Sequence, residues 1–512
     1  MTTEMRTARL GGELRRRTML GGARSRIGNV ILAGALVVGT LLAVTVGGPA
    51  GIASALLLFT PLFALTRQNP VTGRSPGREF ALAVRWRLRR RRGETTLVPL
   101  HLAPPVAAPA TRQQRRAVRA WARSIRDEAP GLEGVEWLGV DGQPGTVLLH
   151  RPPGEPRYLS VALEVDGQAP GLRTDKDYDQ AAAAYGRLLG RLARDSGLIG
   201  GIQSVTRIVP LDSAAHEQWA AGHVDPAAPE LLLSSYAELV RMTAGATEMV
   251  RHYLAVRMPL SAAFLQEAAA CGPGEEGIAR LALAQARWVA SLAASAGLRQ
   301  PRILSAHHLA ALLRHLQNPD FPIDQTVDVS PTTWLRGQRA ERHGTVVDER
   351  WWHRVAAIPR SAVTAEPVGS RWIAPLLYGM AAPVHRTISL CVTVQPAAQA
   401  RRRARQDLTM DVGQGEETAR RGAIDDGTQA VQLSASAQRL ADLQPGSGIH
   451  GAQWTGWVSV SAPSADAVLQ ASTRIGDAAD ECGIAQLDWL GCRHDEALPA
   501  TWPVWRGTEI AP

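Results

Sequence analysis

Thirty-nine consecutive residues without a charged side chain, from Ile27 to Leu65, constrain the fold of this chain more than any other feature. The run is interrupted at Gly47-Gly48-Pro49-Ala50-Gly51 and has no amphipathic stripe for one-sided packing on a soluble core. At a rise of about 1.5 Å per residue, Gly28 to Val46 reaches roughly 28 Å as a helix, close to the hydrocarbon thickness of a bilayer. Pro49 to Leu65 reaches roughly 25 Å, which suits a thin bilayer or snorkelling flanks. The pattern predicts a transmembrane helical hairpin over residues 27–66.

The basic residues of the chain are concentrated beside this run. The formal net charge is +9, yet residues 1–94 carry +12, from sixteen arginines and four glutamates, so the other 418 residues carry −3. Arginine-rich flanks stay on the cytoplasmic side of a membrane, because translocating them is costly and opposes the membrane potential. We therefore expect a two-pass protein of the cytoplasmic (inner) membrane with both termini in the cytosol, and no direct nucleic-acid binding.

An export signal is an alternative interpretation of the N-terminus. Arg16-Arg17 precedes the apolar run like a twin-arginine motif, and Ala53-Ser54-Ala55 resembles a cleavage site. Cleavage after Ala55 would leave an apolar N-terminus, and the arginine cluster that follows is wrong for a translocated segment. The hairpin is therefore the preferred interpretation.

The segment after the hairpin is expected to lie along the membrane surface. Phe80, Val84 and Leu88 recur at helical spacing among arginines, which is also the pattern of an ordinary amphipathic helix packed on protein. In an interfacial helix the tryptophan and the arginines would contact the lipid headgroups. The residues predicted at this membrane interface are Arg85, Trp86, Arg87, Arg89, Arg90, Arg91 and Arg92.

The rest of the chain predicts an α+β fold. Alternating apolar residues predict strands at 202–209, 385–395 and 454–461, with helices between the strands. The element order predicts two ferredoxin-like halves, in 135–317 and 350–492. The expected parts are a basic cytosolic arm (1–26), the transmembrane helical hairpin (27–66), a basic juxtamembrane helix and Pro-rich linker (67–111), a first α+β half (112–246), a helical middle (247–349) and a second α+β half (350–512) with a long helical hairpin (396–444).

No pattern in the sequence predicts catalysis. Lys176 is the only lysine and has no glycine loop, which excludes the phosphate-cradling loop of a nucleotide hydrolase. The four cysteines lack metal-ligand spacing, and a helix would place His307, His308 and His315 too far apart to share a metal, so surface or capping roles are expected. We predict no catalytic residue, no cofactor and no metal.

One basic patch outside the membrane region could dock an acidic partner, although the default interpretation of such a patch is a solvated helix face. Its residues are Arg401, Arg402, Arg403 and Arg405.

The chain resembles two parts of conjugation machinery. The basic two-span hairpin resembles the PrgI-like small membrane proteins of conjugation systems. An actinobacterial family of integral membrane proteins combines such a hairpin with a region similar to the nucleotide-free amino-terminal domain of conjugation and type IV secretion ATPases. The residues that carry this likeness are Leu408-Thr409-Met410-Asp411, Trp457-Val458-Ser459-Val460-Ser461-Ala462, Cys482-Gly483 and Ala497-Leu498-Pro499-Ala500-Thr501-Trp502-Pro503. No catalytic residue is carried over, because in those ATPases the comparable segment precedes the motor domain.

The resemblance implies a non-catalytic membrane component of a conjugation-like or type IV-like secretion apparatus. Such a protein would anchor or recruit a separate ATPase supplied in trans, as a homo-oligomer or within a multi-protein membrane complex. An EccE-like component of type VII secretion, which also joins two N-terminal spans to a soluble domain, is the first alternative. A membrane-anchored enzyme with an unrecognised site is the second.

Overall fold

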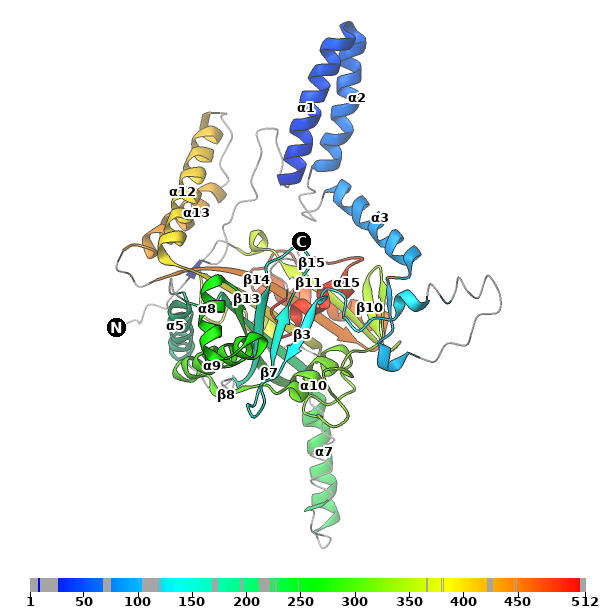
Figure 1. Ribbon diagram of the computed structural model, residues 1–512, viewed down its shortest axis with the longest axis vertical. Coiled ribbons are helices and arrows are strands. Elements are labelled where there is room, and N and C mark those ends of the chain that lie inside the picture. Colours follow the sequence, from blue (N-terminus) through cyan, green and yellow to red (C-terminus); the bar gives the residue numbers. More distant parts are fainter. Residues whose placement is uncertain are drawn as a thin grey trace. The chain divides into compact units, whose positions relative to one another are not determined.

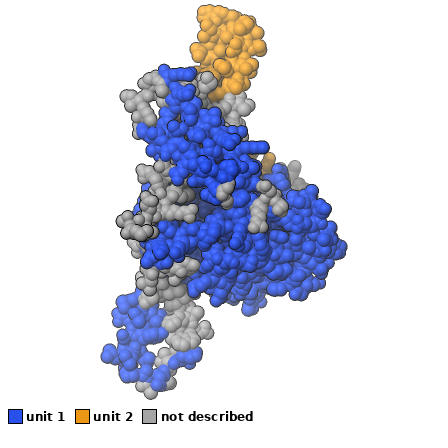
Figure 2. Space-filling view, turned by 90° about the vertical axis from the view of Figure 1, so that its left-hand side faces the viewer, with its two compact units in different colours: residues 1–12, 96–512 blue, residues 13–95 orange. Residues whose placement is uncertain are grey.

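The computed structural model divides the chain into two compact units, residues 13–95 and residues 1–12 together with 96–512 (Figure 2). The structure describes residues 8–9, 26–67, 75–103, 118, 121–167, 174–193, 197–210, 222–223, 225, 228–246, 248–364, 367–378, 380, 382–420, 427–445, 447 and 449–506. Most of the expected basic arm and much of the Pro-rich linker lie outside these residues.

The smaller unit contains a pair of packed helices, α1 (Arg26–Val46) and α2 (Gly48–Thr66). Gly47 and Gly48, between and at the start of these helices, have φ values of 69° and 58°, which glycine adopts without steric cost. Gly51 allows close approach, because a Cβ there would lie 2.7 Å from the carbonyl oxygen of Ala43. Among the described residues, only α2 is long and apolar enough to cross a membrane, and Ile31–Val46 is a shorter apolar stretch.

The third helix of this unit, α3 (Pro76–Arg92), has signals at both ends. The side chain of Ser75 accepts a hydrogen bond from the backbone N–H of Arg78, and proline stands in the first turn. Gly93, with a φ of 77°, ends the helix in the left-handed conformation that glycine favours. The arginines of the last turn complement the negative end of the helix dipole.

A single antiparallel sheet, thirteen-stranded in the described part of the chain, is the framework of the larger unit (Figure 1). The strand order is β2-β9-β10-β11-β14-β13-β6-β7-β5-β4-β3, with β15 also paired to β11 and β8 also paired to β5. The strands are β2 (Thr96–Leu97), β3 (Val135–Leu138), β4 (Val147–His150), β5 (Tyr158–Asp166), β6 (Gly201–Pro210), β7 (Glu248–Pro259), β8 (Arg299–Ile303), β9 (Gln338–Glu341), β10 (Gly344–Val347), β11 (Trp351–Ile358), β13 (His385–Gln395), β14 (Gly451–Ala462) and β15 (Asp488–Trp489). A separate pair consists of β1 (Ala8–Arg9) and β12 (Pro367–Val368). The mixture of helices with one large antiparallel sheet confirms the predicted α+β class.

The helices of the larger unit cover the sheet or extend from it (Figure 1). They are α5 (Asp175–Leu192), α7 (Glu230–Ala246), α8 (Ala262–Cys271), α9 (Gly274–Ser295), α10 (Ala306–Gln317), α11 (Ala374–Leu377), α12 (Ala397–Arg420), α13 (Thr428–Asp442), α14 (Ala465–Glu481) and α15 (His494–Ala497). Three short 3-10 helices are η1 (Leu100–Leu102), η2 (Arg360–Ala362) and η3 (Leu498–Thr501). Thr174 closes a capping box at the start of α5, since its hydroxyl accepts from Asp177 N–H while the Asp177 carboxylate accepts from the Thr174 backbone.

The sheet contains the same order of elements twice. In the first copy the hairpin β3–β4 leads into β5, and β8, β5, β7 and β6 lie in that order. In the second copy the hairpin β9–β10 leads into β11, and β15, β11, β14 and β13 lie in that order. Each copy carries a helical insertion at the same place, α7 between β6 and β7, and α12 with α13 between β13 and β14. Antiparallel pairing of β6 with β13 joins the copies near Val205 and Ser389.

Helices cover the two faces of this sheet differently. On one face, α5, α8 and α9 pack on the first copy, and α14 packs on the second. On the other face, α10 and the segment from α15 to Val504 cover both copies. Gln203 of β6 fixes this terminal segment. Its amide nitrogen donates to the carbonyl oxygens of Ala500 and Trp502, and its amide oxygen accepts from Trp505 N–H at 2.6 Å.

Residues 247–349 differ from the expected helical middle. They contain α8, α9 and α10, but also strands β7 to β10 of the sheet. The sequence of the hairpin β9–β10 shows no clear apolar alternation. Its polar residues are held in the structure by ion pairs. Arg339 forms an ion pair with Glu349 at 2.8 Å and another with Glu341. An irregular polar sequence is therefore part of the ordered sheet.

Candidate functional site

The predicted interface residues lie on α3, and most of them are exposed. Trp86 is half-buried, Arg89 is buried, and Arg90 places its guanidinium 5.5 Å from the centre of the Trp86 ring. The exposed members are Arg85, Arg87, Arg90, Arg91 and Arg92. Phe80 is 69% exposed and Leu88 is also exposed. An exposed surface that carries both apolar side chains and long cations is typical of helices at a membrane interface.

The helices α1 and α2 expose many large apolar side chains. Leu57 is 79% exposed and Val44 is 77% exposed, and neither helix has a charged residue between Ile31 and Leu65. Exposed apolar surface on this scale is unfavourable in water. Together with α3, these helices form the candidate membrane-attachment site of the protein.

The predicted docking patch lies on the first three turns of α12. Arg402, Arg403 and Arg405 are exposed and Arg401 is half-buried, whereas Ala400 and Ala404 face the interior. The hydroxyl of Ser436 on α13 donates to the carboxylate of Asp411, which ties α12 to α13. The patch is thus presented on a helix that is braced by a second helix.

The helix α7 is a further exposed surface, which the sequence did not identify as functional. Its apolar side chains Leu231, Leu232, Leu239 and Met242 are more than half exposed. This helix occupies the position in the first copy that α12 and α13 occupy in the second. The signal was present in the sequence as an apolar helical stripe, but a stripe alone does not distinguish a buried face from an exposed one.

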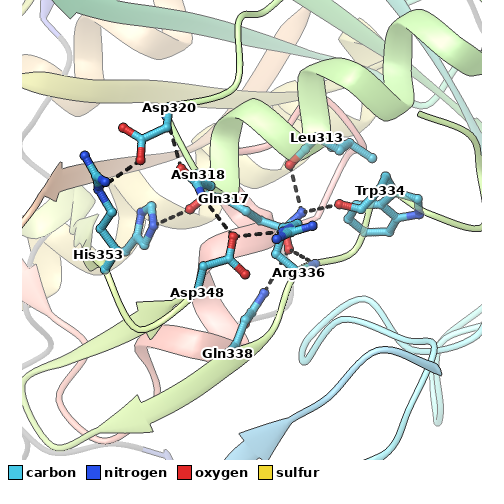
Figure 3. Close-up of polar contacts among 10 residues, drawn as sticks. Leu313, Gln317, Asn318, Asp320, Trp334, Arg336, Gln338, Asp348 and His353 are labelled. Carbon is cyan, nitrogen blue, oxygen red and sulfur yellow. Dashed lines mark hydrogen bonds and ion pairs between the residues drawn. The ribbon is translucent and has the colours of Figure 1, made fainter. Parts of the chain in front are cut away.

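A polar network at the end of α10 connects helix, loop and sheet (Figure 3). The side-chain oxygen of Gln317 accepts from the backbone N–H of Arg336 and from the amide of Gln338, and its nitrogen donates to the carbonyls of Leu313 and Trp334. Both side-chain groups of Gln317 are thus fully used.

Asp348 and His353 extend the network shown in Figure 3. The Asp348 carboxylate accepts from Asn318 and from Arg336, each at 2.8 Å. His353 bonds through Nε2 to the carbonyl oxygen of Gln317 at 2.7 Å, and through Nδ1 to the Ser461 hydroxyl at 2.9 Å. Gln317 and His353 use their hydrogen-bonding atoms within this network or on Ser461, whereas the buried Oε1 of Gln338 has no partner. The contacts join α10 to the sheet, which is a structural role.

Polar side chains also gather on the buried sheet face beneath α10. The register places His353, Ser461 and His385 in one row across β11, β14 and β13. The next row holds Ser459, Thr387 and Arg207. Burial lowers the pKa of His353 to about 3, and the pKa of His385 to about 3 with help from nearby Arg207. These imidazoles are therefore neutral at physiological pH. We call this set, with Tyr253 and His315, the buried polar layer.

The histidines of α10 occupy three different environments. His307 is exposed and His308 bonds to the N-cap hydroxyl of Ser305 at 2.7 Å. The prediction of a surface or capping role is wrong for His315, which is buried and bonds through Nδ1 to the carbonyl oxygen of Phe321 at 2.6 Å. The described residues contain no group of three or more His, Cys, Asp or Glu side chains placed to hold a metal ion.

The candidate functional surfaces of the described chain are thus the apolar helices with α3, the basic patch on α12 and the exposed stripe of α7. Comparison of the sequence with protein-family models and with curated proteins found no match.

Proposed function

We propose that this protein is a non-catalytic component of the cytoplasmic membrane that belongs to a conjugation-like or type IV-like secretion apparatus and anchors or recruits a separate ATPase. The observation that carries the membrane part is the pair of uncharged helices α1 and α2 followed by an arginine-rich helix with exposed Phe80 and Leu88. In water, that exposed apolar surface would be unfavourable for the free energy of folding.

In this proposal α1 and α2 both span the bilayer, and the positive-inside rule places both ends of the pair in the cytosol. The interface residues of α3, from Arg85 to Arg92, then lie among the lipid headgroups. The aliphatic parts of the arginine side chains contact the apolar part of the bilayer, and the guanidinium groups reach the lipid phosphates.

The two copies in the sheet are proposed to be ferredoxin-like. The strand orders β8-β5-β7-β6 and β15-β11-β14-β13 support this, since both correspond to the fourth, first, third and second strands of such a unit. The ATPase role rests on the sequence resemblance, and the docking site proposed for it is the α12 patch of Arg401, Arg402, Arg403 and Arg405. Three of these four cations are exposed on the outward face of α12, where an acidic partner can reach them.

Reporter fusions test the membrane arrangement. A reporter active only outside the cytosol, fused at Ala50, should be active, and the same reporter fused after Pro512 should be inactive. Activity of the second fusion would overturn the proposed topology.

Purification of the membrane complex tests the partner. A tag after Pro512 should recover a secretion or conjugation ATPase with the wild-type chain. Replacement of the four patch arginines by Gln should lower this recovery at least tenfold, because the proposed docking depends on attraction between these arginines and acidic groups of the partner. Arg187→Gln with Arg191→Gln, which removes two exposed arginines of α5 outside the patch, is the control and should leave recovery unchanged. Recovery of the complex without any such ATPase would count against the proposal.

A further inference from the structure

The buried polar layer contains a cation without a counter-charge. Arg207 of β6 is 1% exposed. Its Nη1 donates to the Thr387 hydroxyl at 3.1 Å, and its Nε approaches His315 Nε2 at 3.4 Å, but its buried Nη2 has no hydrogen-bond partner. No carboxylate of the described residues forms an ion pair with it. A guanidinium keeps its proton in proteins, so a full positive charge is buried here.

A second arginine shows how this fold neutralises such a charge. Arg386 lies on the neighbouring strand, is 0% exposed and faces the opposite side of the sheet. Its guanidinium pairs with both carboxylate oxygens of Glu248 and donates to the carbonyls of Leu376, Leu377 and Val384. Burial of an unpaired charge is strongly unfavourable, so the contrast with Arg207 requires an explanation.

The side chains that bond to Arg207 are neutral, and the one cation in register with it, Arg251, is ion-paired to Glu164 and Asp324. His315 holds its proton on Nδ1, which donates to Phe321 O, so the Nε2 that faces Arg207 is a lone pair. Nearby Glu164 forms ion pairs with Arg251 and Arg302. Tyr253, on the same sheet face as Arg207, has a buried hydroxyl that also lacks a partner. Two unsatisfied donors, one of them charged, therefore belong to the same layer.

Gln203, on the same strand as Arg207, provides an internal comparison. The two side chains lie on one face of β6, on either side of Val205, and meet different parts of the covering layer. The segment after α15 saturates the side chain of Gln203 with backbone groups. The helix α10 meets Arg207 through His315 and leaves Nη2 without a hydrogen-bond partner. Arg207 therefore has a side-chain donor, Nη2, that bonds to no group of the described chain.

We propose that Arg207 and Tyr253 bind one monovalent inorganic anion in the buried polar layer. The single unpaired positive charge selects the valence, because Arg251 is already ion-paired, the imidazoles around Arg207 are neutral, and a divalent anion would leave excess negative charge in the core. The guanidinium and the phenol are donors, as an anion requires. The anion pairs the charge that the protein leaves unpaired, and it thereby stabilises the join between the two copies.

Thermal unfolding of the full chain in lipid nanodiscs tests this site, with sodium chloride exchanged for sodium gluconate at constant ionic strength. The wild type should show a saturable rise in melting temperature of roughly 2 °C or more with chloride. Arg251→Gln, which removes a half-exposed arginine in register with Arg207, should keep this response. Arg207→Met should lose it.

Tyr253→Phe keeps the test decisive if Arg207→Met does not fold. Loss of one hydrogen bond to the anion should raise the chloride concentration for half-saturation about tenfold. A water molecule in the same place would satisfy the donors without neutralising the charge, and would give equal melting temperatures in chloride and gluconate. That equality, or an unchanged half-saturation in Tyr253→Phe, would overturn the proposal.

Discussion

At the scale of single residues, acid should destabilise the sheet unit through its buried histidines. Burial lowers the pKa of His353 from 6.5 to about 3. Between these values the unfolded chain binds a proton that the folded chain does not. The contribution of this residue is therefore fully present above about pH 6.5, and it is lost as the pH falls toward 3. The expected loss is about 1.4 kcal/mol per pH unit for this one group.

Urea unfolding at pH 7 and pH 5.5 measures this effect. His353→Gln should reduce the fall in the unfolding midpoint, because the amide can still donate to Gln317 O and accept from Ser461 without taking up a proton. His307→Gln, at an exposed position of the same molecule, should leave the pH dependence as it is. An unchanged pH dependence in His353→Gln would contradict the assignment.

The buried ion pair between Arg386 and Glu248 predicts a large effect from a change of one atom. Glu248→Gln removes the charge that neutralises Arg386 while keeping the side-chain shape, and should destabilise the protein by about 3 kcal/mol. Urea unfolding provides the measurement. Glu276→Gln breaks the exposed pair with Arg280 and should cost less than about 1 kcal/mol. Equal effects of the two substitutions would contradict the difference in burial.

At the scale of elements, the packing of α1 against α2 can be tested by cross-linking. A Cβ at Gly39 would lie 3.6 Å from the Cβ of Ala55, which is within the range that a disulfide spans. Gly39→Cys with Ala55→Cys should therefore form a disulfide in isolated membranes under mild oxidation, measured as protection of both thiols from a maleimide. Gly34→Cys with Ala55→Cys is the control, because a Cβ at Gly34 has no neighbour within 4 Å. Protection in the control alone would show a different helix packing.

Elements with a strong local signal could be predicted from the sequence. The strand predicted at 385–395 is β13, and the strand predicted at 454–461 is the main part of β14. The alternation is strong there because one face packs in the core. The hairpin β9–β10 could not be predicted in this way, since ion pairs rather than apolar contacts hold Arg339.

At the scale of the whole molecule, the continuous sheet was beyond sequence reasoning. Similar element order predicted two halves, but the pairing of β6 with β13 joins strands far apart in the sequence, and no local pattern indicates which strand edges meet. The buried polar layer could not be predicted from the sequence either. The alternating sequence from Trp457 to Ser461 shows that Ser459 and Ser461 share a face, but it does not show that α10 covers that face.

This continuity predicts that the two copies lose protection together. Gln203 lies in the first copy. Its side chain forms hydrogen bonds with backbone groups of Ala500, Trp502 and Trp505, in the segment that follows α15 of the second copy. Gln203→Leu would leave these buried backbone groups without their partner, at a cost of roughly 3 kcal/mol. Hydrogen exchange should then accelerate both in β5 and in β11, because the released segment packs on both copies. Gln143→Leu, which removes a contact with Arg287 at the surface, should leave exchange in both strands unchanged. Faster exchange in only one strand of Gln203→Leu would mean that the copies unfold independently, and that the terminal segment does not unite them.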